Sequence, residues 1–149
     1  MSKTLIIIPA YNEEENIREV IDDWYAVVER CGEESKLVVI DDGSKDATYQ
    51  IIQEYGKDHP RFVPITKTNG GHGTTVLFGY RYAIENGADY IFQTDSDGQT
   101  NPDEFEQFWN LRNEYDVIIG NRVVLRFDYD GYAVMFVNQP MAWIIDFLR

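Results

Sequence analysis

The sequence predicts an α/β protein, specifically a three-layer α/β/α sandwich around a mostly parallel sheet. Two observations carry this prediction. Short continuous apolar runs, typical of strands buried on both faces, alternate regularly with stretches whose apolar residues repeat at helical spacing. The connections between them are short, and neither an internal repeat nor a linker interrupts the pattern. The 149 residues, 44% of them hydrophobic, suffice for one domain with a substantial core.

The first predicted β-α-β unit ends in a pair of acids. Thr4–Ile8 is a continuous aliphatic run and is expected to form the first strand. Asn12 and Glu15 have the spacing of a capping box, so a helix is expected to begin just after Asn12. Leu37–Ile40 forms the second apolar run, and Asp41-Asp42 follows it directly. Such a unit is right-handed in nearly all proteins, and its two strands run parallel in one sheet.

The middle of the chain continues this alternation. Asp46 is expected to cap a second helix, and Phe62–Thr66 is expected to form a third, weaker strand. A glycine-rich turn, Asn69–Gly73, then opens a helix that ends at Gly87. Five residues of this helix are predicted to face the core: Val76, Leu77, Tyr80, Ala83 and Ile84.

The fourth predicted strand lies in the stretch Asp89–Gln99. Its apolar run is rich in β-forming residues and stops at two carboxylates, Asp95 and Asp97. Hard divalent cations such as Mg²⁺ and Mn²⁺ prefer oxygen ligands and often sit between one or two carboxylates and a substrate phosphate. The pair therefore indicates a metal-binding edge, although Asp-x-Asp also occurs by chance in acidic proteins.

The regular pattern ends after residue 122. Asn101 and Pro102 are expected to begin a last helix and Asp116–Gly120 a last strand, which completes a domain over residues 1–122. Residues 123–149 show no strong periodicity and are rich in aromatic side chains. We expect this tail to pack back on the domain. Pairing with a second chain, which would make a homo-oligomer, and contact with a membrane surface are the alternatives.

Composition argues against several function classes. The formal net charge of −13 disfavours nucleic-acid binding, since no basic stripe is present to neutralise phosphates. Cys31 is the only cysteine, so neither an intramolecular disulfide nor a thiolate metal site is expected. The chain opens without the pattern of a signal peptide, and no apolar run approaches the roughly 18 residues of a membrane span. A cytoplasmic location is therefore expected.

Four polar clusters follow predicted strands, at the edge where open α/β sheets bind ligands. They are residues 11–13, 41–42, 95–99 and 121–122. Each has an ordinary alternative, because acids favour a helix N-terminus, Asp-Asp-Gly is often a turn, and glycines permit tight reversal. Their convergence on one edge favours a ligand site. Carboxylates there can accept hydrogen bonds from ribose or a base, or hold the cation that binds a diphosphate, and Arg122 can contact a phosphate directly.

Five motifs together resemble one known family. They are Pro9-Ala10-Tyr11-Asn12-Glu13, Val39 to Ser44 with Asp46 and Thr48, Asn69 to Gly73, Asp95 to Gln99, and Gly120-Asn121-Arg122. In this order and spacing, over residues 4–122, they resemble the family 2 glycosyltransferases and, within them, the dolichyl- or polyprenyl-phosphate sugar transferases. The resemblance implies the GT-A (nucleotide-diphospho-sugar transferase) fold, a UDP- or GDP-linked sugar donor, and a divalent metal, Mg²⁺ or Mn²⁺.

The resemblance also assigns roles to residues of this sequence. The residues implied to line a nucleoside pocket are Pro9, Tyr11, Glu13, Ile40 and Asp42. Those implied to meet the diphosphate and the metal are Asp95, Ser96 and Asp97. Gln99 matches a further metal ligand and Arg122 a donor-binding arginine, whereas His72 has no assigned role and is expected at the surface or at a helix cap.

The resemblance stops where an acceptor-binding region would begin. In the family that region supplies acceptor contacts and, in many members, the acid that deprotonates the acceptor, so no catalytic base is assigned within this chain. The main hypothesis is a metal-dependent, inverting glycosyltransferase whose acceptor is a polyprenyl phosphate or a glycan hydroxyl. A lipid-linked acceptor would place it peripherally at the inner face of the membrane.

Two alternatives come from other function classes. The first is a module that binds nucleotide sugar without transferring it, because the acceptor region is not recognised. The second is a phospho-receiver domain, suggested by the acid pair Asp41-Asp42 after a strand. It fits poorly, because receivers carry the acid pair on their first strand, and no lysine closes the run Asp116–Gly120.

Overall fold

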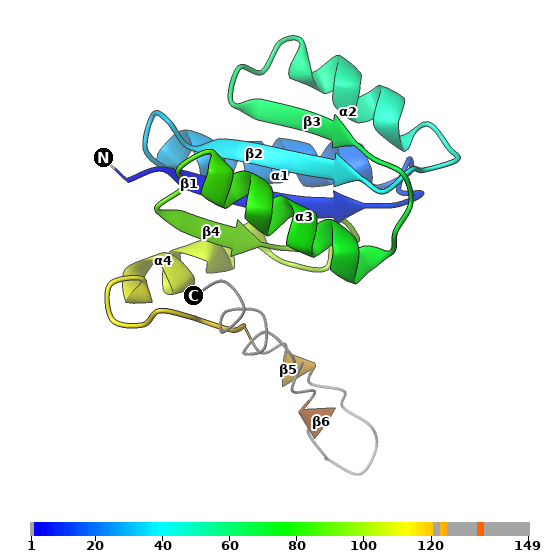
Figure 1. Ribbon diagram of the computed structural model, residues 1–149. Coiled ribbons are helices and arrows are strands. Elements are labelled where there is room, and N and C mark those ends of the chain that lie inside the picture. Colours follow the sequence, from blue (N-terminus) through cyan, green and yellow to red (C-terminus); the bar gives the residue numbers. More distant parts are fainter. Residues whose placement is uncertain (1, 121–122, 125–133, 136–149) are drawn as a thin grey trace. The chain divides into compact units, whose positions relative to one another are not determined.

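The protein folds into two compact units, residues 1–103 and 104–149. The computed structural model describes residues 2–120, 123–124 and 134–135 (Figure 1). The elements of the first unit are β1 (Thr4–Ala10), α1 (Ile17–Arg30), β2 (Lys36–Asp41), α2 (Thr48–Gly56), β3 (Phe62–Thr66), α3 (His72–Glu85) and β4 (Tyr90–Gln93). None of the described helices is both long and apolar enough to cross a bilayer.

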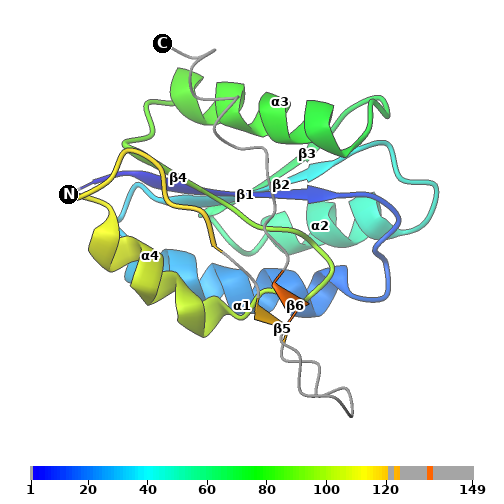
Figure 2. The same cartoon turned by 90° about the horizontal axis from the view of Figure 1, so that it is seen from below.

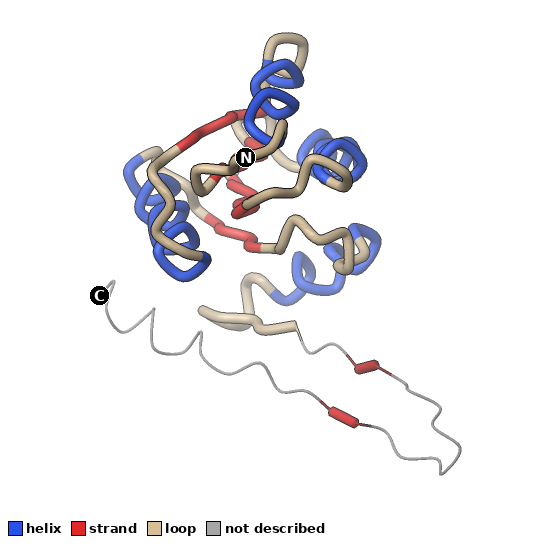
Figure 3. Tube along the Cα trace, turned by 90° about the vertical axis from the view of Figure 1, so that its right-hand side faces the viewer, coloured by secondary structure: helices blue, strands red, loops and turns tan. Residues whose placement is uncertain are grey.

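The four strands of the first unit form one all-parallel sheet in the order β3-β2-β1-β4. Helices α1 and α2 cover one face of the sheet and α3 covers the other, as Figure 2 shows. In Figure 3 the strands are seen between these helical layers. The predicted three-layer α/β/α sandwich with a parallel sheet is therefore confirmed.

The core is built on β1 and β2, which are buried on both faces. All seven residues of β1 are buried. Because side chains alternate along a strand, Leu5 and Ile7 of β1 and Val38 and Ile40 of β2 cluster with Ala83 of α3 on one face. Their neighbours along each strand therefore face α1 and α2. The continuous aliphatic runs in the sequence follow from this burial on two sides.

Two predicted details of the helices are wrong. The first helix begins at Ile17, not after Asn12, because Asn12 has a φ of +54° and its backbone and side chain bind the loop between β2 and α2. On α3, Ile84 is 51% exposed. The side of this helix that meets the sheet instead includes Thr75 and Gly79, both of which are buried.

The described residues of the second unit contain fewer helices and strands than the first unit does. They are α4 (Phe105–Leu111) and the antiparallel pair β5 (Val123–Val124) and β6 (Val134–Met135), and a short 3₁₀ helix η1 (Pro102–Glu104) precedes α4 in the sequence. The strand predicted at Asp116–Gly120 is wrong. These residues are irregular, since no described strand pairs with them and a strand needs a partner for its hydrogen bonds. The domain boundary predicted after residue 122 stays a prediction.

Gly79 allows α3 to approach the sheet closely. A Cβ atom at this position would lie 2.4 Å from Cγ2 of Ile7 and 2.9 Å from Cδ1 of Ile40. Both distances are shorter than van der Waals contact, so a larger residue would displace a core side chain or the helix.

We expect Gly79→Ala to lower the free energy of unfolding by about 1–3 kcal/mol, because overpacking outweighs the better helix propensity of alanine. Urea unfolding measures the change. Gly73→Ala is the matched control on the same helix, because a Cβ there meets nothing within 4 Å. Equal stability of Gly79→Ala and the wild type would contradict the close approach of α3.

Candidate functional site

Three of the four predicted polar clusters meet at one edge of the sheet. Strand β1 lies between β2 and β4 and all three run in the same direction, so their carboxyl ends are neighbours (Figure 1). Residues 11–13 follow β1, Asp42 follows β2, and residues 95–99 follow β4. Asn121 and Arg122 lie outside the described residues, so the donor-binding role of Arg122 stays a prediction.

The loops after β1 and β2 are joined by hydrogen bonds between backbone and side chains. The N–H of Asn12 donates to Oγ of Ser44 (2.9 Å), and the N–H of Lys45 donates to Oδ1 of Asn12 (2.9 Å). The N–H of Glu13 donates to Oγ1 of Thr48 (2.8 Å). These bonds satisfy backbone donors that neither helix can satisfy, and they fix the two loops relative to each other.

The residues predicted to line a nucleoside pocket differ in exposure. Tyr11 is 43% exposed and Glu13 is half-buried, so both side chains can reach a ligand at this edge. Pro9 and Ile40 are buried in β1 and β2, and the side chain of Ile40 belongs to the core cluster. Any contact from Pro9 or Ile40 to a ligand would therefore come from the backbone.

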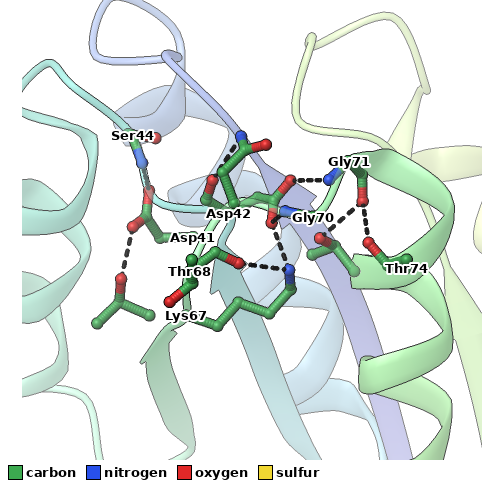
Figure 4. Close-up of polar contacts among 11 residues, drawn as sticks. Asp41, Asp42, Ser44, Lys67, Thr68, Gly70, Gly71 and Thr74 are labelled. Carbon is green, nitrogen blue, oxygen red and sulfur yellow. Dashed lines mark hydrogen bonds and ion pairs between the residues drawn. The ribbon is translucent and has the colours of Figure 1, made fainter.

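Asp42 is the most fully hydrogen-bonded acid of the site, and Figure 4 shows its contacts. Its Oδ1 accepts from the ammonium group of Lys67 and from the N–H of Gly70 (2.9 Å). Its Oδ2 accepts from the N–H of Gly71 (2.8 Å). The side chain amide of Asn69 donates to its carbonyl oxygen (2.9 Å). Asp42 thus binds the glycine-rich turn to the end of β2.

The protonation equilibrium of Asp42 reflects these contacts. Burial by itself would raise the pKa of this carboxyl. The hydrogen bonds from Lys67, Gly70 and Gly71 act in the opposite direction, and they hold the pKa below its ordinary value. The carboxylate is therefore ionised at neutral pH and stabilises the fold in that form.

The neighbouring Asp41 has a local role. Its Oδ1 accepts from the N–H of Ser44 (3.1 Å), and its Oδ2 accepts from the hydroxyl of Thr66 (2.7 Å). Asp41 is 1% exposed. It closes the turn after β2 and holds the end of β3 beside it.

The acid pair after β4 is arranged differently from Asp42. The side chains of Asp95 and Asp97 are exposed, and Ser96 between them is buried. Oδ1 of Asp95 accepts from the side chain amide of Gln93 (3.1 Å), and Oδ1 of Asp97 accepts from the N–H of Gln99 (3.0 Å). Each carboxylate keeps oxygen lone pairs for a further ligand.

Two aromatic side chains of α3 lie close to Asp95. Nε2 of His72 is 3.7 Å from Oδ1 of Asp95, which brings the start of α3 to the end of β4. Tyr80 is 8% exposed. Burial, and after it the negative charge of Asp95, raises the pKa of Tyr80 to about 12. Its phenol therefore stays protonated at neutral pH.

The oxygen ligands of the acid pair suit a hard divalent cation. The described residues contain no group of three or more acidic, histidine or cysteine side chains close enough to hold a metal ion. A cation held by Asp95 and Asp97, with Gln99 as predicted, would therefore need ligands from water and from a substrate phosphate, as Mg²⁺ commonly does. The predicted metal ligands stay a prediction.

A cleft of about 480 Å³ lies beside Asp97, between α1 and residues 97–102. Its walls include Glu19 and Asp23, and acidic walls repel a diphosphate. The cleft faces α1, whereas the glycine-rich turn opens α3 on the other face of the sheet. The cleft and the acid pair share Asp97, so the end of β4 is accessible from the α1 side of the sheet.

Sequence reasoning did not identify Lys67 as part of the site. Lys67 follows β3 and reaches Asp42 across the edge, and its side chain is only 17% exposed. A single lysine two residues before the glycine-rich turn gives no periodic or spacing signal. The only usable hint was that a buried acid needs a cation or hydrogen-bond donors.

Comparison with known proteins decides the family. The family model "Glycosyl transferase family 2" matches residues 5–138, which is most of the chain. The chain belongs to this family. The match confirms the resemblance carried by the five motifs, and it extends beyond residue 122, where the recognised motifs end.

The names of two relatives refer to a dolichyl phosphate and to a polyprenol monophosphate sugar. The dolichyl-phosphate beta-glucosyltransferase ALG5C of Trichomonas vaginalis is 31% identical, over 82% of this chain and 39% of that protein. The polyprenol monophosphomannose synthase of Mycolicibacterium smegmatis is 29% identical, over 82% of this chain and 46% of that protein. The chain therefore spans less than half the length of both relatives.

Solved structures of proteins in complex with nucleotide sugars share the fold. S. aureus TarS 1-349, solved in complex with UDP-GlcNAc, matches with a TM-score of 0.60 and 26% identity, over 76% of this chain and 32% of that TarS chain. The mannosyltransferase PcManGT from Pyrobaculum calidifontis, in complex with GDP-Man and Mn²⁺, matches with a TM-score of 0.55 and 25% identity, over 63% and 27% of the two chains. The predicted GT-A fold is thus confirmed.

The pKa of Asp42 predicts a pH-dependent contribution to stability. Because its pKa is lower in the folded state, its contribution is fully present above the ordinary carboxyl pKa of about 3.9 and is lost as the pH falls through the folded value. We expect Asp42→Asn to lower the free energy of unfolding by about 2 kcal/mol at pH 7.

Urea unfolding of both proteins from pH 7 to pH 2.5 measures this difference. Other carboxylates titrate in the wild type and in Asp42→Asn alike, so the difference between the two proteins isolates Asp42. It should shrink at the acid end of the series. A difference that stays constant with pH would contradict the assigned protonation behaviour.

Proposed function

We propose that this chain forms the donor-binding part of a metal-dependent, inverting glycosyltransferase that uses a nucleotide-diphosphate sugar. The observation that carries the proposal is that Asp42, Asp95 and Asp97 lie at one edge of the sheet, at the carboxyl ends of β2 and β4, the two strands that flank β1. Family membership and the nucleotide-sugar complexes of the structural relatives support it. UDP- and GDP-linked sugars are both candidates, since the two relatives are complexed with one of each.

The two ends of the donor fit different parts of the edge. Tyr11 and Glu13 have the exposure to contact a nucleoside, beside the backbone of Pro9 and Ile40. Asp95, Ser96 and Asp97 lie at the end of β4, where the diphosphate would meet the acid pair. A protein with a net charge of −13 needs a cation there, because two carboxylates would otherwise repel the phosphates.

The proposed metal ligands are Asp95, Asp97 and Gln99. A divalent cation held there supplies a Lewis acid for the departing nucleoside diphosphate. Asp97 accepts a hydrogen bond from the backbone of Gln99, which keeps the two residues in one turn with Gly98 at a φ of +69°. This turn restricts the position of the Asp97 carboxylate before any donor binds.

A polyprenyl phosphate suits this chain better than a glycan hydroxyl as the acceptor. In the transfer, an acceptor oxygen forms a bond to C1 of the sugar while the bond from C1 to the diphosphate breaks, so the configuration at C1 inverts. A hydroxyl acceptor must lose its proton to a base. A phosphate monoester is ionised near neutral pH and needs none. The names of the sequence relatives support a lipid phosphate, and such an acceptor would place the protein peripherally at the inner face of a membrane.

A binding module without transfer activity is the second candidate function. The acid pair Asp95 and Asp97 would serve donor binding alone as well as donor binding followed by transfer. Family membership argues against the phospho-receiver alternative. Calorimetry with UDP- and GDP-sugars, followed by a transfer assay to polyprenyl phosphate, separates the two candidates. Donor binding without transfer or hydrolysis would favour the binding module.

We expect UDP or GDP with Mn²⁺ to raise the melting temperature of the chain. At a nucleotide concentration of one hundred times Kd, the stabilisation should be about 2.7 kcal/mol. Asp97→Ala removes a proposed metal ligand and should weaken Mn²⁺-dependent binding at least tenfold, roughly the loss of one charged contact. Thermal shift and calorimetry measure both effects.

Asp58→Ala is the matched control, because Asp58 is an exposed acid between α2 and β3, at the opposite end of the sheet. It should bind nucleotide as the wild type does. Nucleotide binding that is the same with and without Mn²⁺, or unchanged Mn²⁺-dependent binding by Asp97→Ala, would exclude the proposed metal role.

A further inference from the structure

We infer that Gln93 is a positioning residue of the donor site, because its side chain amide fixes the carboxylate of Asp95 and leaves one oxygen, Oδ2, for the ligand. The inference rests on the proposed function, in which Asp95 holds the cation. None of the five sequence motifs includes Gln93, and the family resemblance implies no role for it.

The end of β4 gives Gln93 a firm position. Gln93 is the last residue of β4 and pairs with Ile7 of β1, a strand that is buried along its whole length. Paired residues of neighbouring strands project to the same face of a sheet, and Ile7 faces α3. The side chain of Gln93 therefore lies on the α3 face, whereas that of Phe92 contacts Trp24 of α1.

Asp95 depends on Gln93 for its orientation. Its side chain is 52% exposed, so packing alone does not hold it. Nε2 of Gln93 donates to Oδ1 of Asp95 (3.1 Å), and Nε2 of His72, at the start of α3, lies 3.7 Å from the same oxygen. Within the part of the chain that the structure describes, both of these contacts are to Oδ1, and Oδ2 keeps its lone pairs for a ligand.

The donor that holds Asp95 is neutral. An amide N–H can direct a carboxylate without cancelling its charge, so Asp95 keeps its negative charge for a cation. Asp42 differs, because the ammonium group of Lys67 compensates its charge. A lysine or an arginine in place of Gln93 would pair with Asp95 and compete with the cation.

The second acid of the pair is held in the same way. The backbone N–H of Gln99 donates to Oδ1 of Asp97 (3.0 Å), so each acid accepts a hydrogen bond from a neutral donor two residues away in the chain. Hydrogen bonds of this kind orient carboxylate ligands, and losing one typically weakens metal binding about 10- to 100-fold. The bond to Asp95 comes from a side chain, so a substitution can remove it without altering the backbone.

Two other roles for Gln93 predict different results. If Gln93 only stabilises the end of β4, its loss lowers stability and weakens nucleotide binding equally with and without Mn²⁺. If it contacts the donor directly, its loss weakens binding whether or not Asp95 is present. If it positions Asp95, its loss weakens only the Mn²⁺-dependent part of binding, and only while Asp95 is present.

The experiment is a double-mutant cycle of Gln93→Met and Asp95→Ala in the full chain. Gln93→Met keeps the length of the side chain but removes the amide donor. Calorimetry with UDP and GDP, each with and without Mn²⁺, measures binding, and urea unfolding measures stability. We expect Gln93→Met to weaken Mn²⁺-dependent binding about tenfold and to leave stability and Mn²⁺-free binding unchanged. Added to Asp95→Ala, it should cause no further loss.

Gln53→Met is the matched control, because Gln53 is an exposed glutamine on α2, and it should bind nucleotide as the wild type does. Three results for Gln93→Met overturn the positioning role and leave the proposed function intact: binding as tight as the wild type, an equal loss without Mn²⁺, or a loss that adds fully to that of Asp95→Ala. Normal Mn²⁺-dependent binding by Asp95→Ala, or failure of the wild type to bind either nucleotide, overturns the proposed function and this inference with it.

Discussion

The buried carboxylate of Asp42 is the interaction on which the ligand edge of this domain depends. It stands at the end of β2, and its bonds to Lys67, Gly70 and Gly71 fix the turn that begins α3. An ionised acid that is 3% exposed is costly unless it is fully paired, and the cation and two backbone donors supply that pairing. The hydrogen bonds that compensate for the burial of this carboxylate thus also hold the loops of the ligand edge in place. The turn is held as a consequence of satisfying one buried charge.

The sheet beneath this edge makes such an arrangement possible. Strands β1 and β2 are buried on both faces, and Gly79 allows α3 to pack directly on Ile7 and Ile40. In a parallel sheet with helices on both faces, all the loops that follow the carboxyl ends of the strands lie at a single edge. Acids that are far apart in the sequence therefore become neighbours. An acidic chain can then bind a phosphorylated donor only with a cation or backbone N–H groups, which is what the exposed acid pair and the glycine-rich turn offer.

Particular residues show how much of the structure could be predicted from the sequence. The aliphatic runs and the motifs at the strand ends were sufficient to predict the strands of the first unit, the fold class and the family. Asn12 was misread as a helix cap, because its spacing to Glu15 fits a capping box while its backbone is bound to the β2–α2 loop. Asp116–Gly120 was misread as a strand, because an apolar run forms one only where a partner strand exists. Ile84 fitted the helical spacing but lies outside the face that Gly79 brings to the sheet.

The sequence by itself determined the α/β/α fold, the family and the candidate acids Asp42, Asp95 and Asp97, because burial on two sides and motif spacing are both local properties of a chain. Only the tertiary structure decided how each of these acids is paired. Asp42 is enclosed by a lysine that lies 25 residues away, whereas Asp95 and Asp97 stay exposed beside the start of α3. Pairing and burial of a charge depend on residues brought together by the sheet, and no local pattern records which lysine reaches which acid.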